Sequence, residues 1–245
     1  MSDLESFPSP FEAVVVGASG GIGAALTRRL AASASVTRVV AMSRSGAVPA
    51  GAKIVPVRID VTDETSIAAA FAETGADLRL VIVAVGRLHD AAGLPEKALR
   101  DLDADAMARS FALNAIGPAL VFKHAAPLLA RTGKSILAAL SARVGSISDN
   151  RKGGWYGYRA AKAALNQIIR TSAIELAAKR RDLVCVGLHP GTVRTAMSAP
   201  FLPGYTANEI FEPDFAASAL LDVVDGLNPA QTGRVFAWDG EEIAP

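Results

Sequence analysis

A tyrosine and a lysine four residues apart are the side chains of this sequence best suited to acid–base chemistry. Tyr158 and Lys162 stand at the start of a stretch with helical periodicity, so both fall on one face of a helix. A tyrosine hydroxyl with its usual pKa of about 10 exchanges protons poorly near neutral pH, and a nearby ammonium lowers that pKa. The pair therefore indicates proton transfer to or from a substrate oxygen. Taken alone the spacing is weak, because an exposed Tyr–Lys pair on a helix surface is the commoner case.

A glycine-rich segment follows the first strongly apolar run of the chain. The run Ala13–Val16 leads straight into the start of a helix, with the residues Gly17, Ala18, Ser19, Gly20, Gly21, Ile22 and Gly23. In a doubly wound sheet this first turn binds the phosphates of a dinucleotide, because glycine lets the backbone approach them and the helix N-terminus supplies free N–H groups. The segment predicts a dinucleotide site, although a tight turn with close packing would use glycine in the same way. Its spacing fits both GxxxGxG and GxxGxxG.

The residues after the second apolar run decide between the two nicotinamide dinucleotides. An acidic residue there would accept hydrogen bonds from the ribose 2′-hydroxyl and repel a 2′-phosphate. The run that ends at Met42 is followed instead by Ser43 and Arg44. The guanidinium of Arg44 can pair with a phosphate and Ser43 can add a neutral donor, so we expect NADP(H) to be favoured over NAD(H). A solvated loop arginine is the alternative interpretation of Arg44.

Short apolar runs alternate with longer helical stretches along the chain. The runs suited to buried strands are Ala13–Val16, Val36–Met42, Ile54–Val57, Leu80–Val85, Ser135–Leu140, Leu183–Leu188 and Arg234–Trp238. Helical periodicity covers Ile22–Ala32, Thr65–Glu73, Ala104–Leu129, Tyr158–Lys179 and Asp214–Asp225. We expect Pro118 and Pro127 to divide or cap the long central stretch. The alternation predicts an α/β fold, a Rossmann-type doubly wound parallel sheet of about seven strands with helices on both faces, in a single domain over residues 1–245 with an N-terminal extension at 1–10.

The composition argues against several classes of protein. Of 245 residues 51% are hydrophobic and 20% are charged, which provides a core and gives no sign of disorder. The net charge of +1 offers no reason to expect a nucleic acid or a membrane as partner. Cys185 is the only cysteine, so no intramolecular disulfide can form. Residues 1–10 lack the pattern of a signal peptide, no apolar stretch approaches the ~20 residues of a membrane helix, and no cluster has metal-ligand spacing. We therefore expect a cytoplasmic protein with no metal site.

In their order and number, the motifs of this chain resemble those of the short-chain dehydrogenase/reductase family from about Ala13 to Trp238. Besides the glycine segment and the Tyr158/Lys162 pair, they include Asp60-Val61, Ala84-Val85-Gly86, Asn114 and Pro190-Gly191-Thr192-Val193-Arg194-Thr195. Four segments are more narrowly similar to C-factor-like and carbonyl-reductase-like members. They are Pro95-Glu96-Lys97, Gly117-Pro118-Ala119-Leu120, Gly145-Ser146-Ile147, and Tyr158-Arg159 leading into Lys162-Ala163-Ala164-Leu165-Asn166. The resemblance implies an NAD(P)-dependent oxidoreductase with a Rossmann-type fold.

The resemblance assigns a role to each matched position. Tyr158 would protonate a carbonyl oxygen or deprotonate an alcohol, and Lys162 would lower its pKa and hold the nicotinamide ribose. Asn114 would kink the central helix and bind a water that links Lys162 to solvent. The other matched residues would bind the cofactor, with Asp60 and Val61 at the adenine, Ala84, Val85 and Gly86 at the ribose, and Pro190, Gly191, Thr192, Val193 and Thr195 at the nicotinamide amide and the phosphates. Ala84 departs from the asparagine usual in the family.

The catalytic serine of the family is the one role without an obvious counterpart. It stands three residues before the glycine that follows the fifth strand, and counting back from Gly145 this position is Ala142. Ser141 is adjacent, but consecutive strand residues point to opposite faces. The interval from Ser141 to Tyr158 is longer than the usual one, so a local shift could bring Ser141 into the site. We assign the role to Ser141 and keep Ala142 as the alternative.

These assignments predict hydride transfer between NADP(H) and a small-molecule carbonyl/alcohol pair. Residues 196–213 would form a substrate lid, and His89 and Asp90 would border the cleft. By resemblance we expect a homodimer or homotetramer. The competing hypothesis is a dinucleotide-binding signalling or interaction protein with weak or vestigial activity, which Ala142 would favour. A nucleotide-sugar epimerase or dehydratase would need a larger substrate domain than the residues after Thr195 provide.

Overall fold

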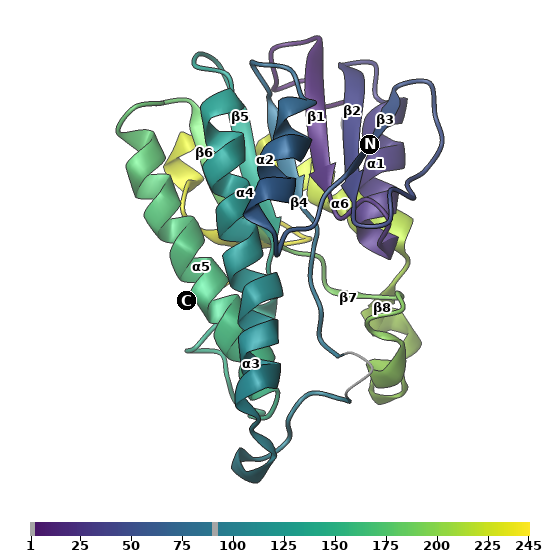
Figure 1. Ribbon diagram of the computed structural model, residues 1–245, viewed down its shortest axis with the longest axis vertical. Helices are drawn as coiled ribbons and strands as arrows, with labels where there is room; N and C mark the ends of the chain where they lie inside the picture. The colour runs from purple at the N-terminus through teal and green to yellow at the C-terminus, as the bar shows by residue number, and fades with distance from the viewer. Residues whose placement is uncertain (1–2, 90–92) are drawn as a thin grey trace.

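The computed structural model describes residues 3–89 and 93–245 and contains a parallel sheet between two layers of helices (Figure 1). Asp90 and the first two residues of the N-terminal extension lie outside the described residues. Seven described strands form the sheet in the order β3-β2-β1-β4-β5-β6-β9, with every neighbouring pair parallel. They are β1 (Phe11–Val16), β2 (Val36–Ser43), β3 (Ile54–Arg58), β4 (Leu80–Val83), β5 (Ser135–Leu140), β6 (Leu183–His189) and β9 (Val235–Ala237). The order reverses between β1 and β4, which opens a ligand crevice at their carboxyl ends.

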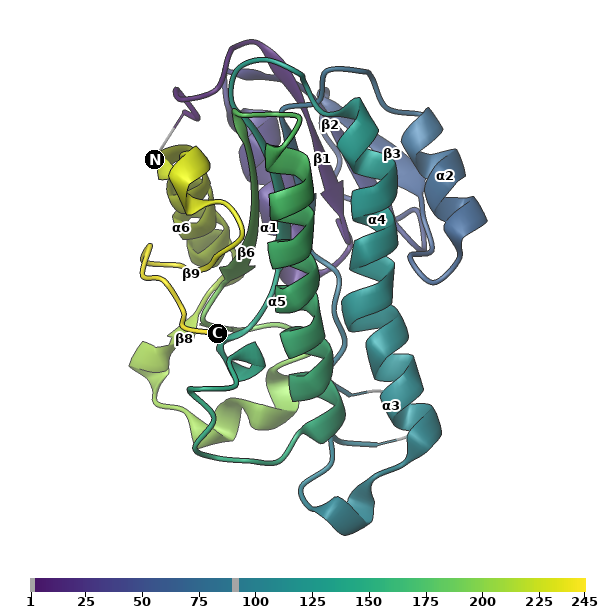
Figure 2. The same cartoon turned by 90° about the vertical axis from the view of Figure 1, so that its left-hand side faces the viewer.

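Helices cover both faces of the sheet (Figure 2). One face carries α1 (Gly21–Ala32) and α6 (Pro213–Gly226), and the other carries α2 (Glu64–Ala72), α4 (Gly117–Ala125) and α5 (Tyr156–Ala177). Successive strand residues serve opposite faces, so Val15 packs in the cluster with α1 while Val14 packs in the cluster with α4 and α5. A sheet covered on both faces needs continuous apolar strands, and this is the pattern that the sequence analysis used. The predicted fold class is confirmed.

The predicted central helix of residues 104–129 is one continuous rod with a local defect. It consists of α3 (Ala104–Phe111), a π-helical turn (Ala112–Ile116), α4 and a final 3₁₀ turn (Ala126–Leu128). Pro118 does not divide the rod where it stands. A proline ring collides with the carbonyl four residues earlier and offers it no N–H, and for Pro118 that residue is Asn114. The chain accommodates the proline in the π-helical turn that contains Asn114.

Two further features lie outside the main sheet. A short parallel pair joins β7 (Thr192–Val193) to β8 (Ile210–Phe211) and fixes both ends of the expected lid, which contains 3₁₀ turns at Ala199–Gly204 and Ala207–Glu209. The described part of the N-terminal extension belongs to the core, because Leu4 and Phe7 are buried and the ring of Phe7 stacks on that of Phe11 with centroids 5.1 Å apart. No described helix is long and apolar enough to cross a membrane.

Candidate active site

The start of α5 is held in place by a glutamate from a distant loop. Trp155 precedes the helix in a left-handed conformation (φ 53°), and its N–H donates to the carbonyl oxygen of Glu96. The carboxylate of Glu96 accepts a hydrogen bond from the N–H of Gly157 at 3.3 Å, which satisfies a free donor of the first turn. A Cβ at Gly157 would lie 2.8 Å from that carboxylate, so a larger residue there would displace the Glu96 side chain. These contacts orient the turn that carries Tyr158.

Tyr158 and Lys162 lie one turn apart on α5, as their spacing predicts, and Lys162 reaches the carboxyl end of β5. Tyr158 lines a pocket of about 540 Å³. The Nζ atom of Lys162 donates to the carbonyl oxygen of Leu140 at 2.8 Å, and it lies 5.8 Å from the centroid of the Tyr158 ring. Lys162 is only 2% exposed, so its ammonium is held by the end of β5 rather than by solvent.

The protonation of the pair differs from the sequence-based expectation. Burial raises the pKa of Tyr158 to about 12 and lowers the pKa of Lys162 to about 8. The ammonium of Lys162 lies 5.8 Å from the centroid of the phenol ring. The loss of solvent around the phenol raises the pKa of Tyr158 by more than this ammonium lowers it. The expected lowering of the tyrosine pKa is therefore wrong for this structure. The phenol is neutral near pH 7 and can donate a proton.

Asn114 and Gly86 complete the surroundings of Lys162. The Oδ1 atom of Asn114 accepts from the N–H of Arg87 at 2.9 Å, and its Nδ2 atom donates to the carbonyl oxygen of Arg87 at 2.9 Å. Nδ2 also donates to the hydroxyl of Ser110 at 3.2 Å. A Cβ at Gly86 would lie 3.4 Å from Asn114 Oδ1 and 3.8 Å from Lys162 Nζ, so both polar groups border the same glycine. The structure brings together three of the predicted residues, Asn114, Gly86 and Lys162.

Ser141 has a different surrounding from the one its predicted role requires. The residue is 4% exposed, and its hydroxyl donates to Oδ1 of Asn166 on α5 at 2.6 Å. Ala142 follows in an extended conformation (φ −153°, ψ 149°) and is partly exposed. Extended neighbours point to opposite faces, so Ser141 and Ala142 cannot both face α5. The hydrogen bond to Asn166 weighs against Ser141 as a substrate donor. The sequence analysis had assigned no role to Asn166.

The glycine segment forms the turn between β1 and α1. Gly17 has φ 94°, and a Cβ there would lie 2.7 Å from the carbonyl oxygen of Ala84; a Cβ at Gly23 would lie 2.1 Å from the carbonyl oxygen of Gly17. A Cβ at Gly21 would lie 2.8 Å from the Thr195 side chain, whereas one at Gly20 would meet nothing closer than 3.5 Å. A side chain would therefore collide with neighbouring atoms at Gly17, Gly21 and Gly23 but not at Gly20, which favours the GxxxGxG interpretation.

The same turn has the properties of an anion site. Ser19, Gly20 and Gly21 are exposed, and Ile22 is partly exposed. No side chain caps the helix at Gly20, and the first turn contains no acidic residue. The N–H groups of the first helical turn have no partners within the helix, and the positive end of the helix dipole lies there.

The end of β2 lies beside an arginine that the sequence analysis missed. The hydroxyl of Ser43 is buried and donates to the carbonyl oxygen of Ala47 at 3.0 Å, while Arg44 is exposed. Arg58 ends β3, pairs in register with Ser43, and donates from Nε to the carbonyl oxygen of Arg44 at 3.4 Å. A basic residue at the end of the third predicted strand was the available signal. Two guanidinium groups therefore stand at this corner of the sheet.

The remaining predicted residues also lie beyond the carboxyl ends of the strands. Asp60 accepts hydrogen bonds from the N–H and hydroxyl of Thr62, which hold the pKa of its carboxyl below the usual value. Val61 is buried beside α4. The segments that follow β4 and β6 supply the others, which are Ala84, Val85, Pro190, Gly191, Thr192 and Val193.

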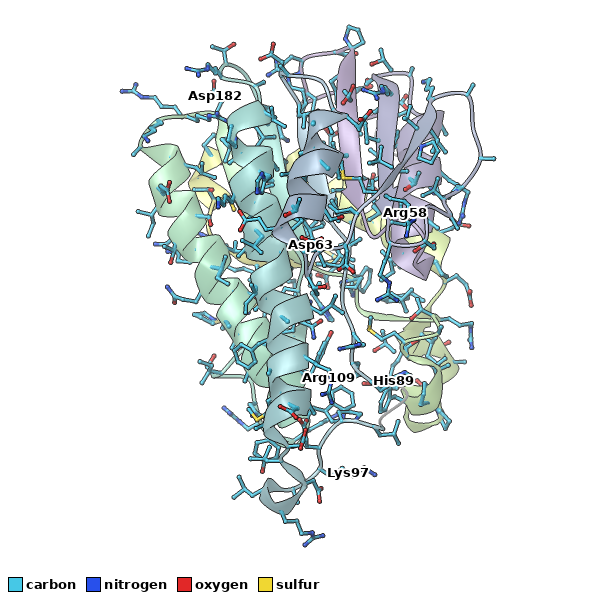
Figure 3. All side chains as sticks on the ribbon, in the orientation of Figure 1. Arg58, Asp63, His89, Lys97, Arg109 and Asp182 are labelled. Carbon is cyan, nitrogen blue, oxygen red and sulfur yellow. The ribbon has the colours of Figure 1, made fainter. Side chains whose placement is uncertain are left out.

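Residues 196–213 contact both the loop after β4 and the residue that precedes α5. His89 Nε2 lies 3.1 Å from the carbonyl oxygen of Met197. The ring of Phe201 packs edge-on against His89 and against Trp155, with centroid distances of 5.9 and 5.0 Å. Residues 196–213 thus connect the loop after β4 with the start of α5. Figure 3 shows His89 on that loop and Arg109 on α3 at the same level of the molecule.

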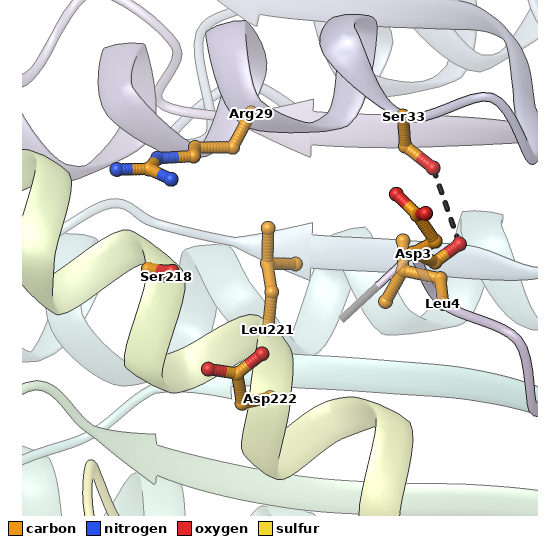
Figure 4. Close-up of a pocket in the computed structure, with 7 residues that line it drawn as sticks. All are labelled: Asp3, Leu4, Arg29, Ser33, Ser218, Leu221 and Asp222. Carbon is orange, nitrogen blue, oxygen red and sulfur yellow. Dashed lines mark hydrogen bonds between the residues drawn. The ribbon is translucent and has the colours of Figure 1, made fainter. Parts of the chain in front are cut away.

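A second hollow lies on the other side of the sheet, among Asp3, Arg29, Leu221 and their neighbours (Figure 4). Its volume of about 20 Å³ holds roughly one water molecule. It contains none of the predicted site residues. Within residues 3–89 and 93–245, no group of three or more His, Cys, Asp or Glu side chains is arranged to hold a metal ion.

Comparisons with known proteins agree with this geometry. The family described as short chain dehydrogenase matches residues 12–205. The "C-signal" protein of Myxococcus xanthus is 39% identical over 148 residues, which cover 60% of this chain and 82% of that protein. The 1-hydroxy-2-glutathionyl-2-methyl-3-butene dehydrogenase of Rhodococcus sp. (strain AD45) is 32% identical over 232 residues, 93% of this chain and 96% of that enzyme. An NADPH-bound carbonyl reductase from chicken fatty liver has a TM-score of 0.83 at 25% identity, covering 98% of this chain and 96% of that one.

Proposed function

Since the chain belongs to the short chain dehydrogenase family, we propose that it is an NADP(H)-dependent oxidoreductase that interconverts a carbonyl and an alcohol. Tyr158 is its general acid and base. The observation that carries the proposal is the position of Tyr158, which lines a pocket of about 540 Å³ and has the ammonium of Lys162 5.8 Å from its ring centroid. Asn114 and Lys162 border the same glycine, Gly86. The pocket has the size of small-molecule sites in enzymes.

The ends of β1, β2 and β3 fit a dinucleotide that carries a 2′-phosphate. The uncapped first turn of α1 would hold the pyrophosphate, because the glycines there leave its N–H groups accessible. Arg44 and Arg58 would hold the 2′-phosphate between them. The carboxylate of Asp60 is already bonded to Thr62, which lowers its pKa, and the charge of Arg44 lowers that pKa further. The NADPH-bound carbonyl reductase of the same fold supports this choice of cofactor.

In the reductive direction, the bound cofactor would supply a hydride to the carbonyl carbon. Burial raises the pKa of Tyr158 to about 12, so the phenol is protonated near neutral pH. It donates this proton to the carbonyl oxygen as negative charge develops there. The ammonium of Lys162 then stabilises the phenolate that remains. Asn114 holds the loop after β4 through its two hydrogen bonds with Arg87. In the oxidative direction the phenolate takes the alcohol proton.

The variant Tyr158→Phe tests the proposal because it removes only the transferable proton. We expect its affinity for NADPH, measured by fluorescence titration, to be unchanged, and its rate of aldehyde and ketone reduction to fall about 10²- to 10⁴-fold. Tyr156→Phe is the matched control, since Tyr156 begins the same helix and has Ala160 rather than a lysine four residues later. A Tyr158→Phe enzyme as fast as the wild type would refute the assignment.

A second candidate function is a dinucleotide-binding signalling protein with weak turnover. Two observations favour it, the bond that engages the hydroxyl of Ser141 and the similarity to the C-signal protein. Under this alternative the wild type would bind NADPH and reduce none of a panel of aldehydes and ketones. The geometry around Tyr158 and Lys162 makes the oxidoreductase the better-supported function.

A further inference from the structure

The charged side chains that line the pocket beside Tyr158 differ in whether they have hydrogen-bond or ion-pair partners. The pocket lies between the loop after β4, the start of α3 and the start of α5. Of the residues that the structure describes, three carboxylates and several cations line it. We infer that the substrate carries a carboxylate in addition to its reacting carbonyl, and that Arg109 and Lys97 bind this carboxylate. The inference rests on the proposed reaction and names the class of substrate for the same site.

Each of the three carboxylates that line the pocket is already bound to backbone N–H groups. Glu96 accepts from Gly157 at 3.3 Å, as described above. Asp101 accepts from the N–H groups of Lys97 and Ala98 at 3.3 and 3.0 Å. Asp103 caps α3 by accepting from the N–H of Ala106 at 2.7 Å. These acids hold the loop and the two helix ends, and Asp101 also lies 3.8 Å from Nε of Arg100. Among the described residues none of the three forms an ion pair with Arg109 or Lys97.

Arg109 and Lys97 are the cations left without a counter-charge. Neither the guanidinium of Arg109 nor the ammonium of Lys97 has an ion pair or hydrogen bond among the residues that the structure describes. Both residues are exposed at the edge of the pocket. They stand on two separate elements, Arg109 on α3 and Lys97 on the loop before it (Figure 3).

The rest of the lining suits the body of such a substrate. Leu88, Leu94 and Pro95 supply apolar surface, and Tyr158 supplies the proton donor. A guanidinium recognises a carboxylate through two parallel N–H donors, and an ammonium adds a point charge. The site therefore fits a carbonyl compound with an aromatic or aliphatic body and a carboxylate away from the reacting carbon.

A pair of aldehydes that differ in one charge tests the inference. 4-Formylbenzoate carries the carboxylate, and its methyl ester carries none. We expect the wild type to have the lower KM for 4-formylbenzoate. Arg109→Met should raise that KM about fivefold, leave the KM for the ester unchanged and leave kcat unchanged for both, because an exposed charge pair contributes to binding rather than to the chemical step.

The matched control is Arg100→Met, which removes the same charge from a nearby side chain that does not line the pocket. The Arg100 side chain is 88% exposed, and its 3.8 Å pair with Asp101 is a weak surface contact. Lys97→Met should give a smaller increase than Arg109→Met, since a lysine offers no bidentate contact. If Arg109→Met and Arg100→Met have equal effects, the increase reflects net charge and the inference fails. A wild type with no preference for 4-formylbenzoate would also overturn it.

A binding measurement separates this inference from the proposed reaction. If neither aldehyde is reduced, calorimetric titration of the NADPH-saturated protein with 4-(hydroxymethyl)benzoate and with its methyl ester still tests the pocket. Tighter binding of the carboxylate that is lost in Arg109→Met supports the inference even when turnover is absent. Equal binding of the two compounds refutes it, whether or not the enzyme reduces other carbonyls.

Discussion

Replacing Ser141 by alanine should cost the protein stability rather than activity. Its hydroxyl is buried and makes one short hydrogen bond, 2.6 Å to Oδ1 of Asn166. Loss of such a bond between neutral groups, with a partly buried acceptor left behind, costs about 1–2 kcal/mol of the free energy of unfolding. For a chain of this length each kcal/mol lowers the melting temperature by about 2–4 °C. Ser141→Ala should therefore melt a few degrees below the wild type.

The kinetic expectation differs by orders of magnitude between the two roles. Removal of a donor that stabilises developing charge on a substrate oxygen costs about 10²–10³ in rate. If Ser141 serves Asn166, Ser141→Ala keeps nearly the wild-type kcat/KM. Ala142→Ser should instead raise kcat/KM, because Ala142 is the partly exposed neighbour and points away from the face that Ser141 serves.

Two measurements on the same preparations decide the matter. NADPH consumption with a panel of aldehydes and ketones gives kcat/KM, and thermal unfolding followed by circular dichroism gives the melting temperature. A Ser141→Ala variant that loses a hundredfold in rate with an unchanged melting temperature would refute this reasoning and restore the serine to the catalytic role.

Two further predictions concern the cofactor and the pH dependence of folding. Arg44→Asp should reverse the order of NADPH and NADH affinities. Arg58→Gln should weaken the binding of NADPH about fivefold and leave that of NADH unchanged, the modest factor being expected because both arginines are exposed and partly screened. Equal affinities in the wild type, measured by fluorescence titration, would contradict both predictions. Burial lowers the pKa of Lys134 from 10.5 to about 8, so between these pH values the unfolded chain binds the proton more tightly and the free energy of unfolding should rise with pH. Urea denaturation at several pH values should show this rise in the wild type and a smaller one in Lys134→Met; an equal rise in both would rule out Lys134 as its source.

The strands of the sheet could be predicted from the sequence because helices cover both faces of the sheet. A parallel strand covered by helices on both faces must be apolar throughout, and Ser135–Leu140 is a strand over the predicted range. The fourth strand was predicted to continue to Val85, yet it ends at Val83. The N–H of Ala84 still donates to the carbonyl oxygen of Val16, but the carbonyl group of Ala84 packs against Gly17 and does not continue the strand pairing. Hydropathy continues across such a bend, so it cannot mark the end of the strand.

The pairing of β7 with β8 was beyond reach for a different reason. Thr192–Val193 and Ile210–Phe211 are two residues each, too short for any period to register. Their pairing depends on the path of the lid between them, and that path is held by contacts such as those of Phe201 with His89 and Trp155. A sequence pattern describes the surroundings of a residue along the chain, whereas these contacts join separate segments.

The residues of the site likewise fall into those that sequence spacing places together and those that only tertiary contacts bring together. Tyr158 and Lys162 are neighbours on one helix face, so their spacing alone placed them together. The direction of the Ser141 side chain depends on where β5 ends and on its hydrogen-bond partner on α5. That partner is Asn166, and only the packing of α5 against β5 identifies it. Arg58 stands beside Arg44 because β3 pairs with β2 in a register that carries Ser43 opposite Arg58. Chemistry within one helix can thus be inferred from spacing, and chemistry across strands requires the register.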